Sequence, residues 1–305
     1  MPAILRMIAV ALMSVLLLLA IACGGGSGGD SGASDADDAS NLFVSDPAVA
    51  LAASADRFER SVTSVQADFS FDMSAGGFEM GAEGDFAYRA PDSLYMKMSM
   101  NGGGGGLFGG GDVGDFEIIA LGDELYMNSS FTGWIELSLA EMGADGESFR
   151  DLLSSHSPLD YRAMLEAAGG EIESLGEEGG NQHVRMTVDL GDLMAAMLDS
   201  VGTDENVTTE DVFGGAGISG PIIVDVWTDS ETLLPQRVVA EGEFGVDSEF
   251  ATFRMEVKFH DYNGSIEIPE PPEDAKSLAE MFGDFDFEAD ADGDTVPDLF
   301  STEGN

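Results

Sequence analysis

The chain has 305 residues, of which 58 are acidic and 12 basic, giving a net charge of −46 at pH 7. Such a surface repels phosphate groups, which excludes ordinary nucleic-acid binding and disfavours adhesion to anionic lipid headgroups. A single cysteine excludes intramolecular disulfide bonds. The charge fits solubility in a salty habitat, which we favour for the chain as a whole, or binding of divalent cations.

Residues 1–22 have the three parts of a secretory signal. Arg6 and the amino terminus supply positive charge, residues 7–22 form an apolar run with one serine, and Cys23 follows directly. The run is short for a membrane-spanning helix, which needs about 20 residues. The segment resembles the lipobox of bacterial lipoproteins, although Ala20 stands where leucine is usual. We therefore expect lipid attachment at Cys23 and a location on the extracytoplasmic face of the cell membrane. The alternatives are an ordinary signal peptide or a retained anchor.

The mature chain divides into three parts by composition. Residues 23–44 form a lipidated Gly/Ser/Asp tether, in which residues 24–41 contain no large apolar side chain. A flexible segment of that length has an end-to-end distance of about 20–25 Å. Residues 45–270 hold the folded domain, and residues 271–305 form an acidic tail.

The domain is expected to open with one amphipathic helix over residues 47–64. Ser45 or Asp46 can cap it, and Pro47 suits its first turn. Apolar residues then recur at steps of three and four from Leu51 to Val65, which is helical spacing.

Beyond this helix the apolar period changes to two, which predicts antiparallel strands joined by short turns. Gly122-Asp123 and Asp229-Ser230 are the clearest turn positions. The expected strands are residues 67–73, 80–86, 94–100, 116–121, 124–128, 134–137, 171–175, 183–190, 222–228, 236–244 and 250–262.

Helical patterns interrupt this series at residues 149–153, 158–168 and 191–201. Long strands with a few helices predict an α+β fold: a curved antiparallel sheet, or half-barrel, with helices covering its concave face. Residues 102–111 are glycine-rich and lie between two strands. No Lys-Ser or Lys-Thr follows them, so they are not a phosphate-binding loop.

Nothing in the sequence predicts an enzyme. His156, His183 and His260 lack partners at metal-ligand spacing, and there is no HExxH or GxSxG motif. His260 and Asp261 are adjacent, but neighbours within a strand point to opposite faces. Carboxylate pairs are uninformative in a chain with 58 acidic residues.

The acidic tail contains a calcium-like pattern. Asp290, Asp292, Asp294 and Asp298 alternate around Gly293, which resembles one thrombospondin type 3 repeat and could converge several oxygens on Ca²⁺. The glutamate that ends an EF-hand loop is missing, because that position is Ser301. A disordered acidic tail without bound ions is the alternative. No other cofactor is expected.

Methionine is frequent in the apolar stripes, with 16 residues in the chain. Flexible methionine side chains suit surfaces that adapt to varied apolar ligands, although most simply fill a core. A curved sheet with helices across it can enclose an apolar cavity. We expect such a cavity to be lined by Phe69, Phe71, Met96, Met98, Met194 and Met197.

Three passages resemble a known group of lipoproteins. They are Asp85–Met96, Gly122–Met127 with Gly133-Trp134, and Val224–Asp229 with Leu233–Arg237. With the lipidated cysteine and the order of elements, they resemble the LppX/LprAFG lipoproteins, and are similar to LolA/LolB carriers and RseB-type sensors. The likeness covers residues 45–270. It implies a half-barrel of about eleven strands, with acyl chains in its concavity and no catalytic residues.

The sequence therefore predicts a membrane-anchored lipoprotein that binds or carries a lipid or other apolar ligand. The alternative is a structural or envelope-sensing surface lipoprotein with a filled core and no ligand.

Overall fold

A computed structural model gives the fold of the chain. It describes residues 42–75, 78–90, 92–102, 114–122, 124–130, 132–138, 171–189, 220–246, 249–277 and 280. The predicted signal, Cys23, the three later helical stretches and the calcium-like tail lie outside these residues. Within them, no helix has the length and apolar character needed to cross a membrane.

The described chain opens with the predicted helix, α3 (Pro47–Ser61). Asp46 caps it by accepting a hydrogen bond from the Val49 amide at 3.2 Å, and Pro47 occupies its first turn. The helix ends where Val62 takes an extended conformation. Residues 42–45 are already helical and Phe43 is buried in the core, so ordered structure begins within the segment expected to be tether.

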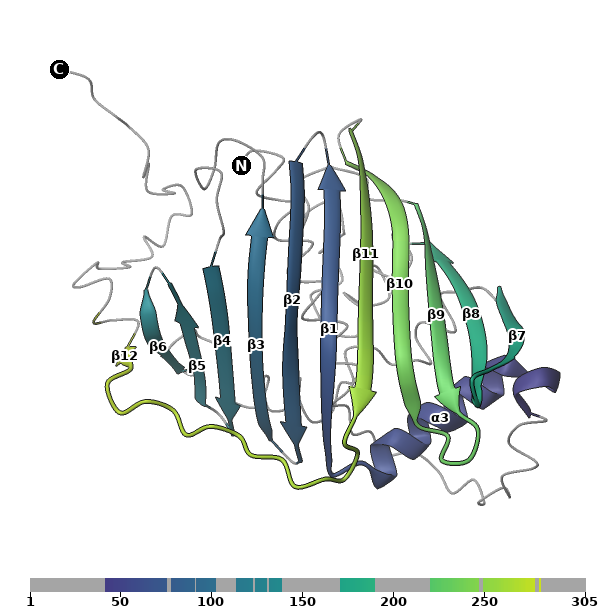
Figure 1. Cartoon of the computed structure of the whole chain (residues 1–305), viewed down its shortest axis with the longest axis horizontal. Coiled ribbons are helices and arrows are strands. Elements are labelled where there is room, and N and C mark those ends of the chain that lie inside the picture. The colour runs from purple at the N-terminus through teal and green to yellow at the C-terminus, as the bar shows by residue number, and fades with distance from the viewer. Residues whose placement is uncertain are drawn as a thin grey trace, which may run out of the picture.

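After the helix the described chain builds one sheet of 12 strands, in which eleven pair antiparallel and the twelfth is a two-residue parallel addition (Figure 1). Its order is β12-β6-β5-β4-β3-β2-β1-β11-β10-β9-β8-β7, so the last long strand pairs with the first. All eleven predicted strands are present, most of them longer than expected. They are β1 (Ser64–Ala75), β2 (Phe78–Arg89), β3 (Ser93–Gly102), β4 (Gly114–Leu121), β5 (Glu124–Ser129), β6 (Gly133–Ser138), β7 (Ile172–Glu178), β8 (Asn181–Asp189), β9 (Pro221–Asp229), β10 (Pro235–Val246) and β11 (Glu249–His260).

The sheet has one apolar and one polar face. On β1, buried residues from Val65 to Ala75 alternate with exposed ones such as Asp68 and Asp72. The pairing register carries this alternation across the neighbouring strands. We call the face of Phe69 and Phe71 the inner face, and the face of Asp68 and Asp72 the outer face.

The helix α3 belongs to the inner-face core. Leu51 and Phe58 are buried in the same cluster as the inner-face residues, and Phe58 meets Phe259 edge to face at 6.4 Å. Ser54 ties the helix to the turn between β9 and β10 by donating to the Leu233 carbonyl at 2.8 Å. The fold is thus one large, open, curved antiparallel sheet. A set of helices covering its concave face is not part of the described structure.

After β11 the chain turns back along the sheet to reach its far edge, a feature that the sequence did not predict. This strap, residues 261–277, runs past the ends of the central strands to β12 (Lys276–Ser277), which pairs in parallel with β6 (Figure 1). Its Ile266 and Ile268 pack with the outer-face residues Ala87, Ile119 and Tyr126 in a second, smaller core.

The opposite edge strand, β7, is irregular. Its register with β8 shifts between Ser174 and Gly176, and Gly176 has a φ of +91°. A bulge of this kind, with Glu177 and Glu178 beside it, disfavours pairing with another sheet.

Candidate functional site

The inner face is the largest apolar surface that the strands build. Its buried core runs from β8 across β9, β10, β11, β1 and β2 to β3. From β8 to β6, every described side chain at an inner-face register position is uncharged. Apolar groups of a ligand would gain free energy by burial against such a face. A charged group would lose its hydration there and find no opposite charge.

Four of the six predicted lining residues lie together on this face. Phe69 and Phe71 on β1 are 4% and 2% exposed, and Met96 and Met98 on β3 are 2% and 5% exposed. They flank the central strand β2. The remaining two, Met194 and Met197, lie outside the described residues. The four are buried in one core cluster, and whether they contact a ligand stays a prediction.

A glycine on β2 separates the two pairs. Gly84 is opposite Phe69 on one side and Met98 on the other. A Cβ at Gly84 would lie 2.9 Å from Phe69 Cζ and would also collide with the Lys97 carbonyl oxygen. The Phe69 ring therefore occupies the space above the β2 backbone.

Methionine supplies much of the inner face. The buried core contains seven of these flexible side chains, which are Met73, Met80, Met96, Met98, Met100, Met186 and Met255. Thioether side chains repack at low cost around ligands of different shape. The face is therefore chemically suited to apolar groups that vary in shape.

Two buried polar side chains interrupt the inner face at the end where α3 is tied down. Gln182 on β8 and Thr228 on β9 are direct partners, 4% and 0% exposed. Among the residues that the structure describes, the Thr228 hydroxyl has no hydrogen-bond partner. No sequence pattern distinguishes this threonine from those on the outer face.

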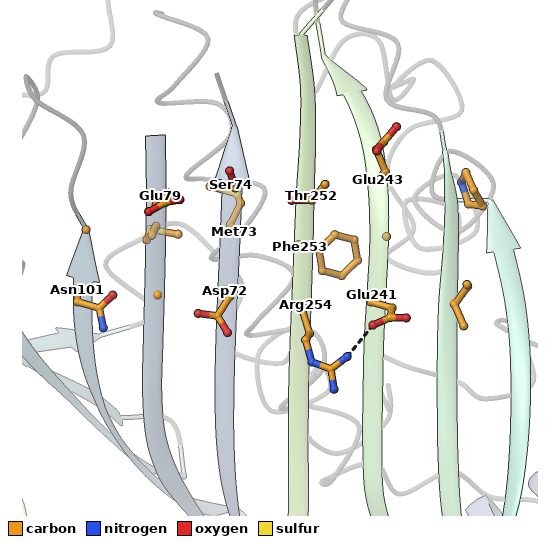
Figure 2. A pocket seen from close by; sticks show the side chains of 16 residues that line it. Asp72, Met73, Ser74, Glu79, Asn101, Glu241, Glu243, Thr252, Phe253 and Arg254 are labelled. Carbon is orange, nitrogen blue, oxygen red and sulfur yellow. Dashed lines mark hydrogen bonds and ion pairs between the residues drawn. The ribbon is translucent and has the colours of Figure 1, made fainter. Parts of the chain in front are cut away.

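The outer face is polar and carries a groove of about 1010 Å³. Asp72, Glu79, Glu241 and Glu243 surround it, and Arg254 bonds to Glu241 (Figure 2). A second depression of about 430 Å³ lies between Glu83, Asp115 and Lys258. Both are open to solvent and have several acidic side chains in their lining, unlike the apolar cavity expected from the sequence.

The outer face of β7, β8 and β9 holds a polar network that the sequence did not predict. Asp225 is 5% exposed, and both of its oxygens accept hydrogen bonds from Arg185 at 2.9 Å. His183 bonds to Asp225 at 2.9 Å and stacks on Trp227, with ring centroids 4.1 Å apart. Trp227 also donates to Glu178 of the edge strand at 2.9 Å.

This network fixes the charge state of Asp225. Burial by itself raises the pKa of the carboxyl, but hydrogen bonds from Arg185 and His183 outweigh it, so the pKa lies below its usual value. The ionised carboxylate makes His183 Nε2 a donor. These partners meet because β8 and β9 are paired in register, which the spacing of single residues in the sequence could not show.

One expectation about the histidines is wrong. His260 and Asp261 were expected on opposite faces, but His260 Nδ1 and Asp261 Oδ2 are 2.8 Å apart. The reason is that β11 ends at His260 and Asp261 has a φ of +52°, so the alternation of a strand no longer applies. The pair is exposed and begins the strap.

In the residues that the structure describes, no three His, Cys, Asp or Glu side chains gather closely enough to hold a metal ion. The predicted calcium ligands, Asp290, Asp292, Asp294 and Asp298, are not among those residues, and neither is Cys23.

Comparison with known proteins gives only distant likenesses. No family model and no curated protein matches the chain. A LolA superfamily protein from Nitrosomonas europaea is 11% identical over 78% of this chain and 96% of its own length, with a TM-score of 0.23. A DUF1329 family protein from Desulfovibrio piger is 9% identical over 77% and 96%, also with a TM-score of 0.23. A β-barrel-like DUF1849 protein from Brucella abortus is 8% identical over 66% and 98%, with a TM-score of 0.20. Similarities this low assign the chain to no family.

Proposed function

We propose that this protein binds or carries a lipid or other apolar ligand on the inner face of its sheet, without catalysis. The observation that supports this most is the continuous, uncharged, methionine-rich inner face. Burying one methylene group there would contribute about 0.8 kcal/mol, so a single acyl chain would suffice for useful affinity. The resemblance of the sequence to LppX/LprAFG lipoproteins and LolA-type carriers implies the same function.

A second part of the proposal concerns attachment. Cys23, at the end of an apolar signal, would carry lipid and hold the domain on the extracytoplasmic face of the cell membrane. The tether that follows would keep the inner face within reach of that membrane. Labelling cells with a radioactive fatty acid tests this: wild type should incorporate label, Cys23→Ser should not, and label in both would contradict lipidation there.

Ligand binding can be tested with the chain from residue 24 onward, purified and freed of lipid. Titration with N-phenyl-1-naphthylamine, which brightens in apolar surroundings, should give saturable fluorescence. Met98→Gln places a polar amide on the inner face and should weaken binding. The matched outer-face variant, Ser99→Gln, should not. Absence of saturable binding to folded wild-type protein would contradict the proposal.

One observation favours the alternative of a structural or sensing lipoprotein without ligand. The four described lining residues are at most 5% exposed, as in a filled core. Under this alternative the Met98→Gln substitution lowers stability, and the purified protein contains no lipid.

Calcium binding by the tail remains a separate proposal. Asp290, Asp292, Asp294 and Asp298 would supply carboxylate oxygens to one Ca²⁺. Calorimetric titration of the full mature chain should show a binding event that the double variant Asp292→Asn/Asp294→Asn lacks. Equal heats of binding from both proteins would mean that these aspartates do not bind Ca²⁺.

A further inference from the structure

The buried threonine of the inner face has a hydroxyl that no described part of the chain bonds. Thr228 is 0% exposed, and its Oγ1 has no hydrogen-bond partner in the described ranges of the chain. Buried hydroxyls are nearly always satisfied, and an unsatisfied one lowers the folding equilibrium constant by about tenfold or more. A ligand that bonds to the Thr228 hydroxyl would explain why this buried group has no partner within the described protein.

The neighbours of Thr228 show that a hydroxyl is not needed for packing. The inner-face residue before it on β9 is Val226, and Val226 pairs with Val184 on β8. Valine has nearly the shape of threonine, so it would fill the same space without a polar atom. Packing alone therefore gives no reason for the hydroxyl.

The partner across the strands is also polar and only loosely satisfied. Gln182 pairs directly with Thr228 and donates to Ser230 Oγ over 3.4 Å, while Ser230 itself donates to the Gly180 carbonyl at 2.9 Å. The two side chains form one polar spot, a hydroxyl beside an amide, next to a large apolar surface.

The charge of the face limits what this spot can bind. None of the described inner-face side chains from β8 to β6 is charged. A carboxylate or phosphate placed beside Thr228 would therefore lose its hydration without gaining a counter-charge. A hydroxyl, ester or amide loses less. A hydroxyl or an amide can both accept from and donate to the pair, and an ester oxygen can accept from it.

We propose that Thr228, with Gln182 beside it, is the hydrogen-bonding anchor for an uncharged polar group of an otherwise apolar ligand. This inference rests on the proposed function and narrows it to neutral lipids such as acylglycerols. The polar group would lie at the end of the inner face where Ser54 of α3 bonds to Leu233, and the apolar chain would extend over Phe69 and Phe71.

The test uses the delipidated mature chain with two probes that compete with N-phenyl-1-naphthylamine: 1,2-dioleoylglycerol and hexadecane. Thr228→Val should weaken binding of dioleoylglycerol about tenfold, the effect of losing one buried hydrogen bond, and leave hexadecane unchanged. Thr228→Ser, which keeps a hydroxyl, should bind dioleoylglycerol nearly as wild type does. Thr252→Val, at an exposed outer-face position, is the control and should change neither probe.

Stability without ligand gives a second measurement. Because Thr228→Val removes an unsatisfied hydroxyl, it should raise the thermal midpoint of the ligand-free protein by about 2–4 °C. A lower midpoint would mean that the hydroxyl already has a partner, and would overturn the anchor. Unchanged dioleoylglycerol binding in Thr228→Val would also overturn the anchor while leaving the proposed function intact. If folded wild-type protein binds neither probe, the proposed function fails and the anchor with it.

Discussion

The aromatic ring of Phe69 lies where a side chain on Gly84 would have to be. The two residues are direct cross-strand partners on β1 and β2, and a Cβ at Gly84 would come within 2.9 Å of Phe69 Cζ. Met98 on β3 is the partner of Gly84 on its other side, so Phe69 and Met98 lie on either side of a position without a side chain.

The substitution Gly84→Ala tests this packing. The added methyl group must displace Phe69 or the backbone of β3, which should lower the free energy of unfolding by about 2–3 kcal/mol. Urea unfolding followed by circular dichroism gives the value. Gly81→Ala is the matched control, because its closest contact is the movable side-chain oxygen of Asn101. If both variants lower the free energy of unfolding by the same amount, the close packing at Gly84 does not constrain this position more than Gly81 is constrained.

The network around Asp225 makes stability depend on acid pH. Its pKa lies below the ordinary value of 3.8, so its ionised form stabilises the fold fully above that pH. The contribution is lost as pH falls through the folded-state pKa. Asp225→Asn should cost about 3 kcal/mol at pH 7, less than a fully buried pair because Arg185 is partly exposed.

Urea unfolding of wild type and Asp225→Asn between pH 7 and pH 3 measures this effect, and the difference between them should shrink below about pH 4. Asp56→Asn, which breaks an exposed pair with Arg60 on α3, should change stability by less than about 0.5 kcal/mol. A difference that stays constant with pH would mean that Asp225 does not contribute through its charge.

Tyr126, beneath the strap, should ionise at a higher pH than an ordinary tyrosine. Burial, the hydrogen bond to Glu124 and the charges of Glu124 and Glu136 raise its pKa to about 12. Because the folded-state pKa exceeds the ordinary value of 10.0, this group stabilises the fold fully below pH 10. That contribution is lost as pH rises toward 12. The absorbance titration of wild type minus that of Tyr126→Phe should show one tyrosine ionising near pH 12, and ionisation near pH 10 would contradict the burial.

The strap should stabilise the far edge of the sheet through its isoleucines. Ile268 is 8% exposed in the small core with Tyr126, so Ile268→Ala should cost about 2–4 kcal/mol. Hydrogen exchange in β5 and β6 should accelerate more than in β9. Val44→Ala, at a position 70% exposed, is the control and should be nearly neutral. Uniform acceleration over the sheet would mean that the strap is not a local support.

Much of the sheet could be predicted because each strand shows its own alternation of apolar and polar residues in the sequence. The alternation on β1 to β3 marks each strand directly, and Asp46-Pro47 marks the start of α3. The strap was missed because Ile266 and Ile268, followed at once by Pro269, are too few to show a period, and their partners are distant in sequence. The Asp225 network and the Thr228–Gln182 pair depend on register between strands about 40 or more residues apart. Only folding brings those side chains together.

Native mass spectrometry of the chain from residue 24 onward shows whether the inner face takes up an apolar ligand. Protein purified from its host should carry an excess mass of one lipid, which disappears on denaturation and returns when lipid is added back. The same measurement on Met98→Gln should show reduced occupancy. A bare mass for folded wild-type protein, both as purified and after lipid addition, would mean that the inner face does not bind lipid.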